Sequence, residues 1–149
     1  LMGPAMAGIC VSAASIAAVV GRVGVGTFID RVQPRFAAAT SLAMQVGALI
    51  TMVLVSDPYV VFGACIVFGL GVGNLITFPS LIVQREFEAR DFARVVSLLT
   101  AINQMTYAFG PGLLGWLRDL HGSYALPHLV AAGLMSFAAF VVLIGPKRS

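Results

Sequence analysis

The sequence predicts an all-α polytopic membrane protein, a bundle of helices that crosses a bilayer several times. Of its 149 residues, 59% are hydrophobic and only 10% are charged, whereas water-soluble domains have about 25% charged residues. A water-soluble chain of this length exposes much of its surface, and this composition leaves too few polar side chains to cover it. Disorder is excluded as well, because disordered chains have low hydrophobicity.

Five apolar stretches are each long enough to cross the hydrocarbon core, which takes about 20 residues of helix. They cover approximately residues 4–28, 36–55, 59–83, 95–117 and 124–144. Barrel strands are excluded because they are shorter and alternate polar with apolar side chains. Arg22 interrupts the first stretch, and the other four contain no Asp, Glu, Lys or Arg. We therefore expect five transmembrane helices joined by short polar connections, with no water-soluble domain.

The positive charges predict how the helices are oriented. The first and third connections and the C-terminal tail carry Arg31, Arg35, Arg85, Arg90, Arg94, Lys147 and Arg148. The opposite side carries only Arg118, beside Asp119. Because positive residues mark the cytoplasmic side, we expect an N-terminus outside and a cytoplasmic C-terminus, in a plasma (inner) membrane. This distribution also argues against a nucleic-acid partner, which needs a clustered basic face.

A motif lies between the first two stretches. The segment reads G-T-F-I-D-R-V-Q-P-R from Gly26 to Arg35, and it resembles the signature G-x-L-A-D-R-x-G-R-K of the major facilitator superfamily. In that superfamily the signature follows helix two and recurs, weakened, after helix eight. Gly26, Asp30, Arg31 and Arg35 match the signature. Gln33 and Pro34 depart from it, which fits the second copy better than the first.

A second motif closes the fourth stretch. The segment from Gly110 to Tyr124 resembles the pattern G-P-x-L-x-G-x-L-x-D-x-x-G-x-Y at the end of helix eleven in the same superfamily. Together the two motifs identify the whole chain as resembling helices eight to twelve, within the C-terminal six-helix half of the fold. The resemblance implies a lipid bilayer, a small-molecule substrate and the missing N-terminal half as partners, and no cofactor.

The first motif lies at the cytoplasmic end of a helix. A carboxylate there can accept hydrogen bonds from a neighbouring helix start or pair with an arginine. The resemblance implies that Gly26, Asp30, Arg31 and Arg35 form a latch that holds one face of a two-domain transporter shut. For Arg31 the alternative is an interfacial side chain that only sets topology.

Arg22 is the sharpest single feature. It lies eight residues before Asp30, about 12 Å deeper along a helix, where a charge is costly and usually faces the interior of a bundle. The sequence around it resembles the eighth helix of superfamily members that carry anions, which implies that Arg22 binds the anion. Its planar, permanently charged fork suits a carboxylate. The alternative is that Arg22 pairs with another residue for structural reasons, or that its side chain extends to the cytoplasmic surface of the membrane.

Polar side chains at spacings of three and four mark one face of the fourth stretch: Ser97, Thr100, Asn103, Gln104 and Tyr107. Such a face should meet protein or water, and the resemblance implies that it lines the central cavity. We expect Asn103, Gln104 and Tyr107 to bind substrate, with hydrogen bonds between helices as the alternative. In the third stretch, Asn74 is a further candidate. The glycines and Pro79 around it suit either a gating helix or tight packing.

The sequence thus predicts a fragment of a secondary active transporter, which moves a small solute, such as a small organic or inorganic anion, by alternating access. One alternative is a non-transporting scaffold or receptor on the same fold. Another is an intramembrane enzyme, but the sequence offers no histidine at the depth of its intramembrane serines, no paired buried aspartates and no H-E-x-x-H motif. We therefore expect no catalytic residue and no metal site.

Overall fold

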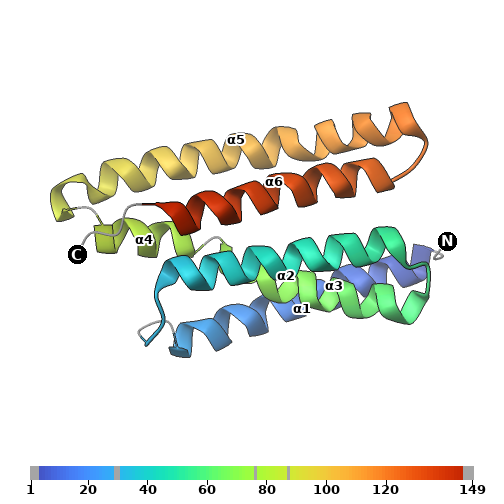
Figure 1. Ribbon diagram of the computed structural model, residues 1–149, viewed down its shortest axis with the longest axis horizontal. Helices are drawn as coiled ribbons and strands as arrows, with labels where there is room; N and C mark the ends of the chain where they lie inside the picture. The colour runs from blue at the N-terminus through green and yellow to red at the C-terminus, as the bar shows by residue number, and fades with distance from the viewer. Residues whose placement is uncertain (1–3, 29–30, 76, 87, 146–149) are drawn as a thin grey trace.

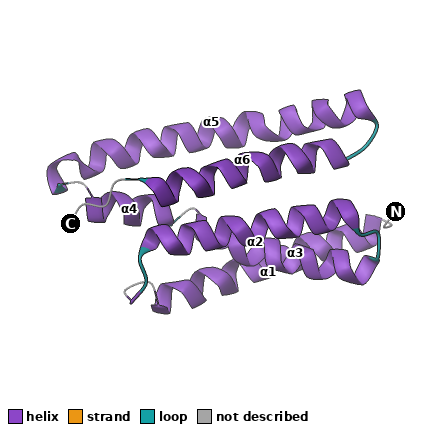
Figure 2. Cartoon of the chain, in the orientation of Figure 1, coloured by secondary structure: helices purple, strands orange, loops and turns teal. Residues whose placement is uncertain are grey.

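The computed structural model describes residues 4–28, 31–75, 77–86 and 88–145, and these residues confirm the all-α fold class. They form six helices: α1 (Pro4–Phe28), α2 (Pro34–Leu54), α3 (Pro58–Leu75), α4 (Phe78–Glu86), α5 (Ala89–His121) and α6 (Ala125–Ile144). Within these ranges there is no strand, and short turns join the helices (Figure 2).

Four segments of the described chain are long and apolar enough to cross a membrane. They are Ala5–Thr27, Pro34–Leu54, Pro58–Gln84 and Ala125–Ile144. The fourth expected stretch, residues 95–117, lies within α5, which is not among these segments. The polar side chains from Ser97 to Tyr107 lower the hydropathy of this helix. With 33 residues, α5 is about 50 Å long, which exceeds the hydrocarbon core.

The ends of the helices follow from their sequences. Pro34 begins α2, where its missing N–H is not needed. The Asp57 carboxylate caps α3, because its Oδ1 accepts hydrogen bonds from the N–H groups of Tyr59 at 2.9 Å and Val60 at 3.1 Å. Gly122 ends α5 in the left-handed conformation, with φ of 66°.

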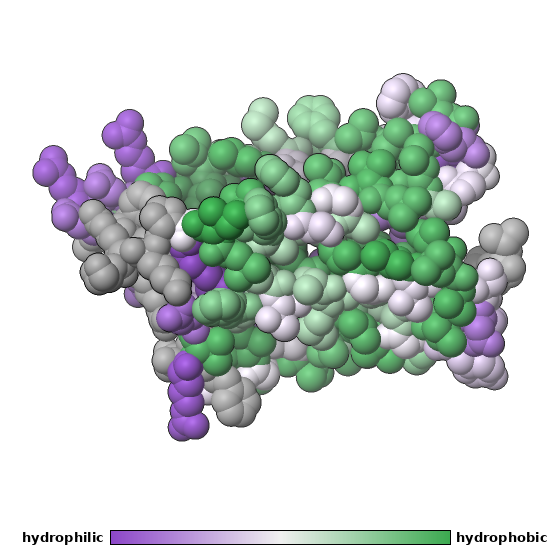
Figure 3. Space-filling view, viewed as in Figure 1, coloured by the Kyte–Doolittle hydropathy of each residue, from purple (hydrophilic) through white to green (hydrophobic). Residues whose placement is uncertain are grey.

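The helices run up and down in sequence order, with α2 in the middle of the bundle (Figure 1). α1 packs on α3, α2 packs on both α3 and α6, and α5 lies alongside α6 and α4. Hydrophilic residues gather at the two ends of the bundle, and the long face seen between them is mainly apolar (Figure 3). α1, α2 and α3 alternate in direction, α4 continues in the direction of α3, and α5 and α6 alternate again (Figure 1). The described residues Arg31, Arg35, Arg90 and Arg94 therefore belong to one end.

The contact between α1 and α3 is made by small residues. A side chain at Gly69 would collide with the backbone of Ala14, and one at Gly73 with the backbone of Ala18. Small residues spaced by four on both helices let two membrane helices approach to backbone contact. The sequence left two roles open for the glycines of the third stretch, a gating helix or tight packing. In this structure they pack tightly against α1.

The third stretch is not one continuous helix, as expected from residues 59–83, but two. α3 ends at Leu75 and α4 begins at Phe78. Pro79 has no N–H to donate to the carbonyl of Leu75, which removes a hydrogen bond from the helical ladder. The N–H of Thr77 donates to the carbonyl of Asn74 at 3.0 Å, three residues back instead of four. The proline and this shortened turn account for the break.

Candidate functional site

Arg22 projects from α1 and ties that helix to the end of α3. Its Nε donates a hydrogen bond of 2.9 Å to the carbonyl oxygen of Gly73. The last four carbonyls of a helix lack partners within it, and a cation is favourable at this negative end of the helix dipole. The structural pairing weighed for Arg22 is therefore present, and the side chain is otherwise exposed.

The bond to Gly73 uses one nitrogen of the guanidinium. An arginine has five N–H donors in a planar fork, so the two Nη groups keep four of them. No hydrogen bond joins these groups to another residue in the described part of the chain. Arg22 can therefore hold the end of α3 and still present donors to a ligand.

The polar face of α5 is exposed over its whole length. Ser97, Thr100, Asn103, Gln104 and Tyr107 all lie on the surface of this chain. The Ser97 hydroxyl donates to the carbonyl of Ala93 and that of Thr100 to the carbonyl of Val96, at 2.7 and 2.8 Å. The amides of Asn103 and Gln104 have no hydrogen bond within the described residues. No described helix covers this face, which leaves it open to another part of the protein or to water.

Asn74 differs from the other candidate substrate ligands. Its side chain is 4% exposed, and its Nδ2 donates to the carbonyl of Leu70 at 3.1 Å. It lies next to Gly73 at the end of α3. Asn74 is therefore part of the helix break in this structure rather than of an open surface.

The structure does not gather the candidate substrate ligands into one pocket. Arg22 lies on α1 with Asn74 near it at the end of α3, whereas α5 is on the opposite side of α2 and α6 (Figure 1). α1, which carries Arg22, and α5, which carries the polar face, are thus not packed against each other in the described part of the chain.

The matching residues of the first motif are at the ends of helices. Gly26 faces open space, and Arg31 is exposed. Arg35, at the start of α2, donates from Nη1 to the carbonyl of Val142 in the last turn of α6, at 3.4 Å. Asp30 lies outside the described residues. Arg35 therefore caps one helix, as Arg22 does another.

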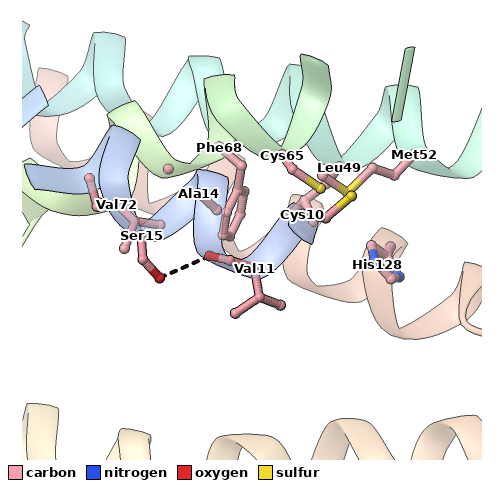
Figure 4. A pocket seen from close by; sticks show the side chains of 12 residues that line it. Cys10, Val11, Ala14, Ser15, Leu49, Met52, Cys65, Phe68, Val72 and His128 are labelled. Atoms are coloured by element: carbon pink, nitrogen blue, oxygen red, sulfur yellow. Dashed lines mark hydrogen bonds between the residues drawn. The ribbon is translucent and has the colours of Figure 1, made fainter. Parts of the chain in front are cut away.

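A cavity of about 380 Å³ lies among α1, α2, α3 and α6. Its lining is mainly apolar, and it contains Cys10, Ser15, Met52, Cys65 and His128 (Figure 4). None of the candidate substrate ligands lines it. The sulfur atoms of Cys10 on α1 and Cys65 on α3 lie close together (Figure 4). The sequence indicated only two buried thiols, because it does not tell which helices are neighbours.

Comparison with known families gives one match. The family model described as Major Facilitator Superfamily matches residues 2–149. No curated protein and no solved structure matches the chain.

Proposed function

This chain belongs to the Major Facilitator Superfamily and is an integral membrane protein with a secondary transporter fold, and on that premise we propose that it transports a small anion by alternating access. The family match over residues 2–149 is the observation that carries the transport proposal. Arg22 and the uncovered polar face of α5 support the presence of a polar path.

We further propose that the chain is helices eight to twelve of a twelve-helix transporter. On this assignment α1 is helix eight, α3 and α4 together are helix ten, and α5 is helix eleven. The two motifs support it, since the first follows α1 and the second lies at the end of α5. The N-terminal half then supplies the other wall of the path, and its contact with Asp30 and Arg31 closes the cytoplasmic latch. The arginine-rich end of the bundle faces the cytoplasm of a plasma (inner) membrane.

An anion is the substrate class that Arg22 favours. A permanent positive charge at this depth of a membrane helix is costly unless it faces a partner or a polar cavity. Without an anion, the Nε donor is held by the carbonyl of Gly73. The planar fork of the guanidinium matches the two oxygens of a carboxylate or nitrate. Asn103, Gln104 and Tyr107 would contribute neutral hydrogen bonds from α5. Asn74 reaches substrate only when the end of α3 rearranges.

Transport assays on the full-length protein in liposomes test this proposal. The solutes are labelled oxalate, lactate and nitrate, offered singly. We expect uptake of at least one, and a KM about 10- to 100-fold higher in Arg22→Ala, because hydrogen bonds to a charged group contribute about 1.5–3 kcal/mol. Arg118→Ala, an exposed arginine that pairs with Asp119, is the matched control and should transport normally.

Two results would contradict parts of the proposal. Unchanged uptake of every transported anion in Arg22→Ala would refute the role of Arg22. Protein that transports none of a broad solute panel, yet folds and inserts, would favour the scaffold or receptor alternative. In the scaffold or receptor case, cysteines introduced along the polar face of α5 would also fail to react with water-soluble thiol reagents.

A further inference from the structure

We propose that Arg22 is a positioning residue that holds the break between α3 and α4, and that an anion bound to Arg22 releases this hold. The inference rests on the proposed anion transport and adds that anion binding to Arg22 moves α4. Arg22 and its partner Gly73 lie 51 residues apart in the sequence.

The carbonyl of Gly73 needs a partner because of the break. In a continuous α-helix it would accept the N–H of Thr77, four residues ahead. Here that N–H donates to Asn74 instead. A backbone carbonyl without a partner is costly where no water is present. The Nε of Arg22 supplies the missing donor at 2.9 Å.

The break separates a segment that is fixed to α1 from one that is not. Up to Gly73, α3 is in backbone contact with α1 through Ala14 and Ala18. Beyond the break, α4 packs mainly on α2 and α5. Arg22 lies one helical turn after Ala18, so its hydrogen bond is made where the fixed segment ends. The hydrogen bond from Arg22 therefore holds the chain at the position where α4 can turn relative to α1.

An anion competes with Gly73 for the same guanidinium. A carboxylate that binds the side of the fork takes one N–H from Nε and one from Nη. A full negative charge attracts the guanidinium more strongly than a helix end, which is equivalent to about half a charge. Once Nε leaves, the carbonyl of Gly73 needs the N–H of Thr77 again. Anion binding therefore favours a hydrogen bond from the N–H of Thr77 to the carbonyl of Gly73, and a shifted α4.

Distances between spin labels on the full-length protein in liposomes test the proposal. The labels are attached at Thr27→Cys on α1 and Gln84→Cys on α4, two exposed positions at the same end of the bundle, after replacement of Cys10 and Cys65 by serine. Labels at Thr27→Cys and Thr40→Cys, which do not span the break, are the matched control pair. The starting buffer contains only a bulky sulfonate as its anion.

We expect Arg22→Gln without added anion to move the mean distance between α1 and α4 by about 3 Å, on the order of two residues of helical rise. The control pair should not change. Arg22→Lys keeps a cation and a donor for Gly73 but lacks the planar fork. It should retain the distance of the native protein and lose its response to anions, which separates the hold on the break from anion binding.

Oxalate and nitrate, added singly, should move the native distance in the same direction as Arg22→Gln does, and should not move it in that variant. An unchanged distance in Arg22→Gln would overturn the hold on the break. A transported anion that leaves the native distance unchanged would overturn the coupling, while the proposed function stands. A shift in Arg22→Gln together with no transport of any anion would refute the anion function and leave the hold intact.

Discussion

At the scale of single residues, two arginines each donate a hydrogen bond to the end of a neighbouring helix. Arg22 donates to the carbonyl of Gly73 near the end of α3, and Arg35 donates to the carbonyl of Val142 near the end of α6. Helix ends leave carbonyls without partners, and in a membrane these carbonyls have no water to accept from. Arginine is suited to this task because it stays charged and carries several donors.

The Asp57 cap gives a prediction at the same scale. Replacement of Asp57 by alanine removes the acceptor for the N–H groups of Tyr59 and Val60. We expect a loss of about 0.5–2 kcal/mol in the free energy of unfolding, measured by thermal unfolding of the full-length protein in detergent. Asp57→Ser keeps a capping oxygen and should lose less. Equal stability of the alanine variant and the native protein would show that this cap contributes nothing.

At the scale of helices, the contact between α1 and α3 depends on the absence of side chains at the interface. Gly73→Ala would drive a methyl group into the backbone of Ala18, whereas Gly63 on the same helix faces open space. We expect Gly73→Ala to destabilise the protein by about 1–3 kcal/mol through overpacking. Gly63→Ala should be neutral or stabilise it by up to about 1 kcal/mol, because alanine favours helix. The free energies of unfolding of the two variants, measured under the same conditions, test this prediction. A Gly73→Ala variant more stable than Gly63→Ala would contradict the packing of α1 on α3.

The cysteine pair tests the same neighbourhood directly. Cys10 on α1 and Cys65 on α3 are the only cysteines of the sequence, and their thiols are in contact. We expect oxidation by oxygen with a copper–phenanthroline catalyst to join the two helices. Trypsin cuts after Arg31 or Arg35, and the fragments should then separate only after reduction. Fragments that separate without reduction would place α1 and α3 apart. Cys65→Ser is the control.

At the scale of the whole molecule, the two helices that carry the candidate residues lie apart. α2 and α6 lie between α1, which carries Arg22, and α5, which carries the polar face (Figure 1), and a transport path needs walls around the solute. We expect the 149 residues alone to insert into liposomes without transporting any solute that the full-length protein carries. Solute uptake by this segment alone, measured with the same labelled anions, would overturn this expectation.

The sequence was sufficient for the fold class, because the length of apolar stretches depends on local composition. α1 covers the residues of the first expected stretch, and α6 differs from the fifth by one residue at its start. Pro79 indicated a weak point in the third stretch, but the extent of the break depends on the hydrogen bond between Thr77 and Asn74. The partner of Arg22 was beyond prediction, because it depends on which helices are neighbours.

Counterflow tests the central claim, alternating-access transport, most directly. Liposomes containing the full-length protein are loaded with unlabelled oxalate, lactate or nitrate, and the same anion is added outside in labelled form at trace concentration. We predict that the label accumulates transiently above its equilibrium level inside, because each return of the site carries an unlabelled anion outward. Label that never exceeds equilibrium for any of these anions, with protein shown to be folded and inserted, would contradict the account.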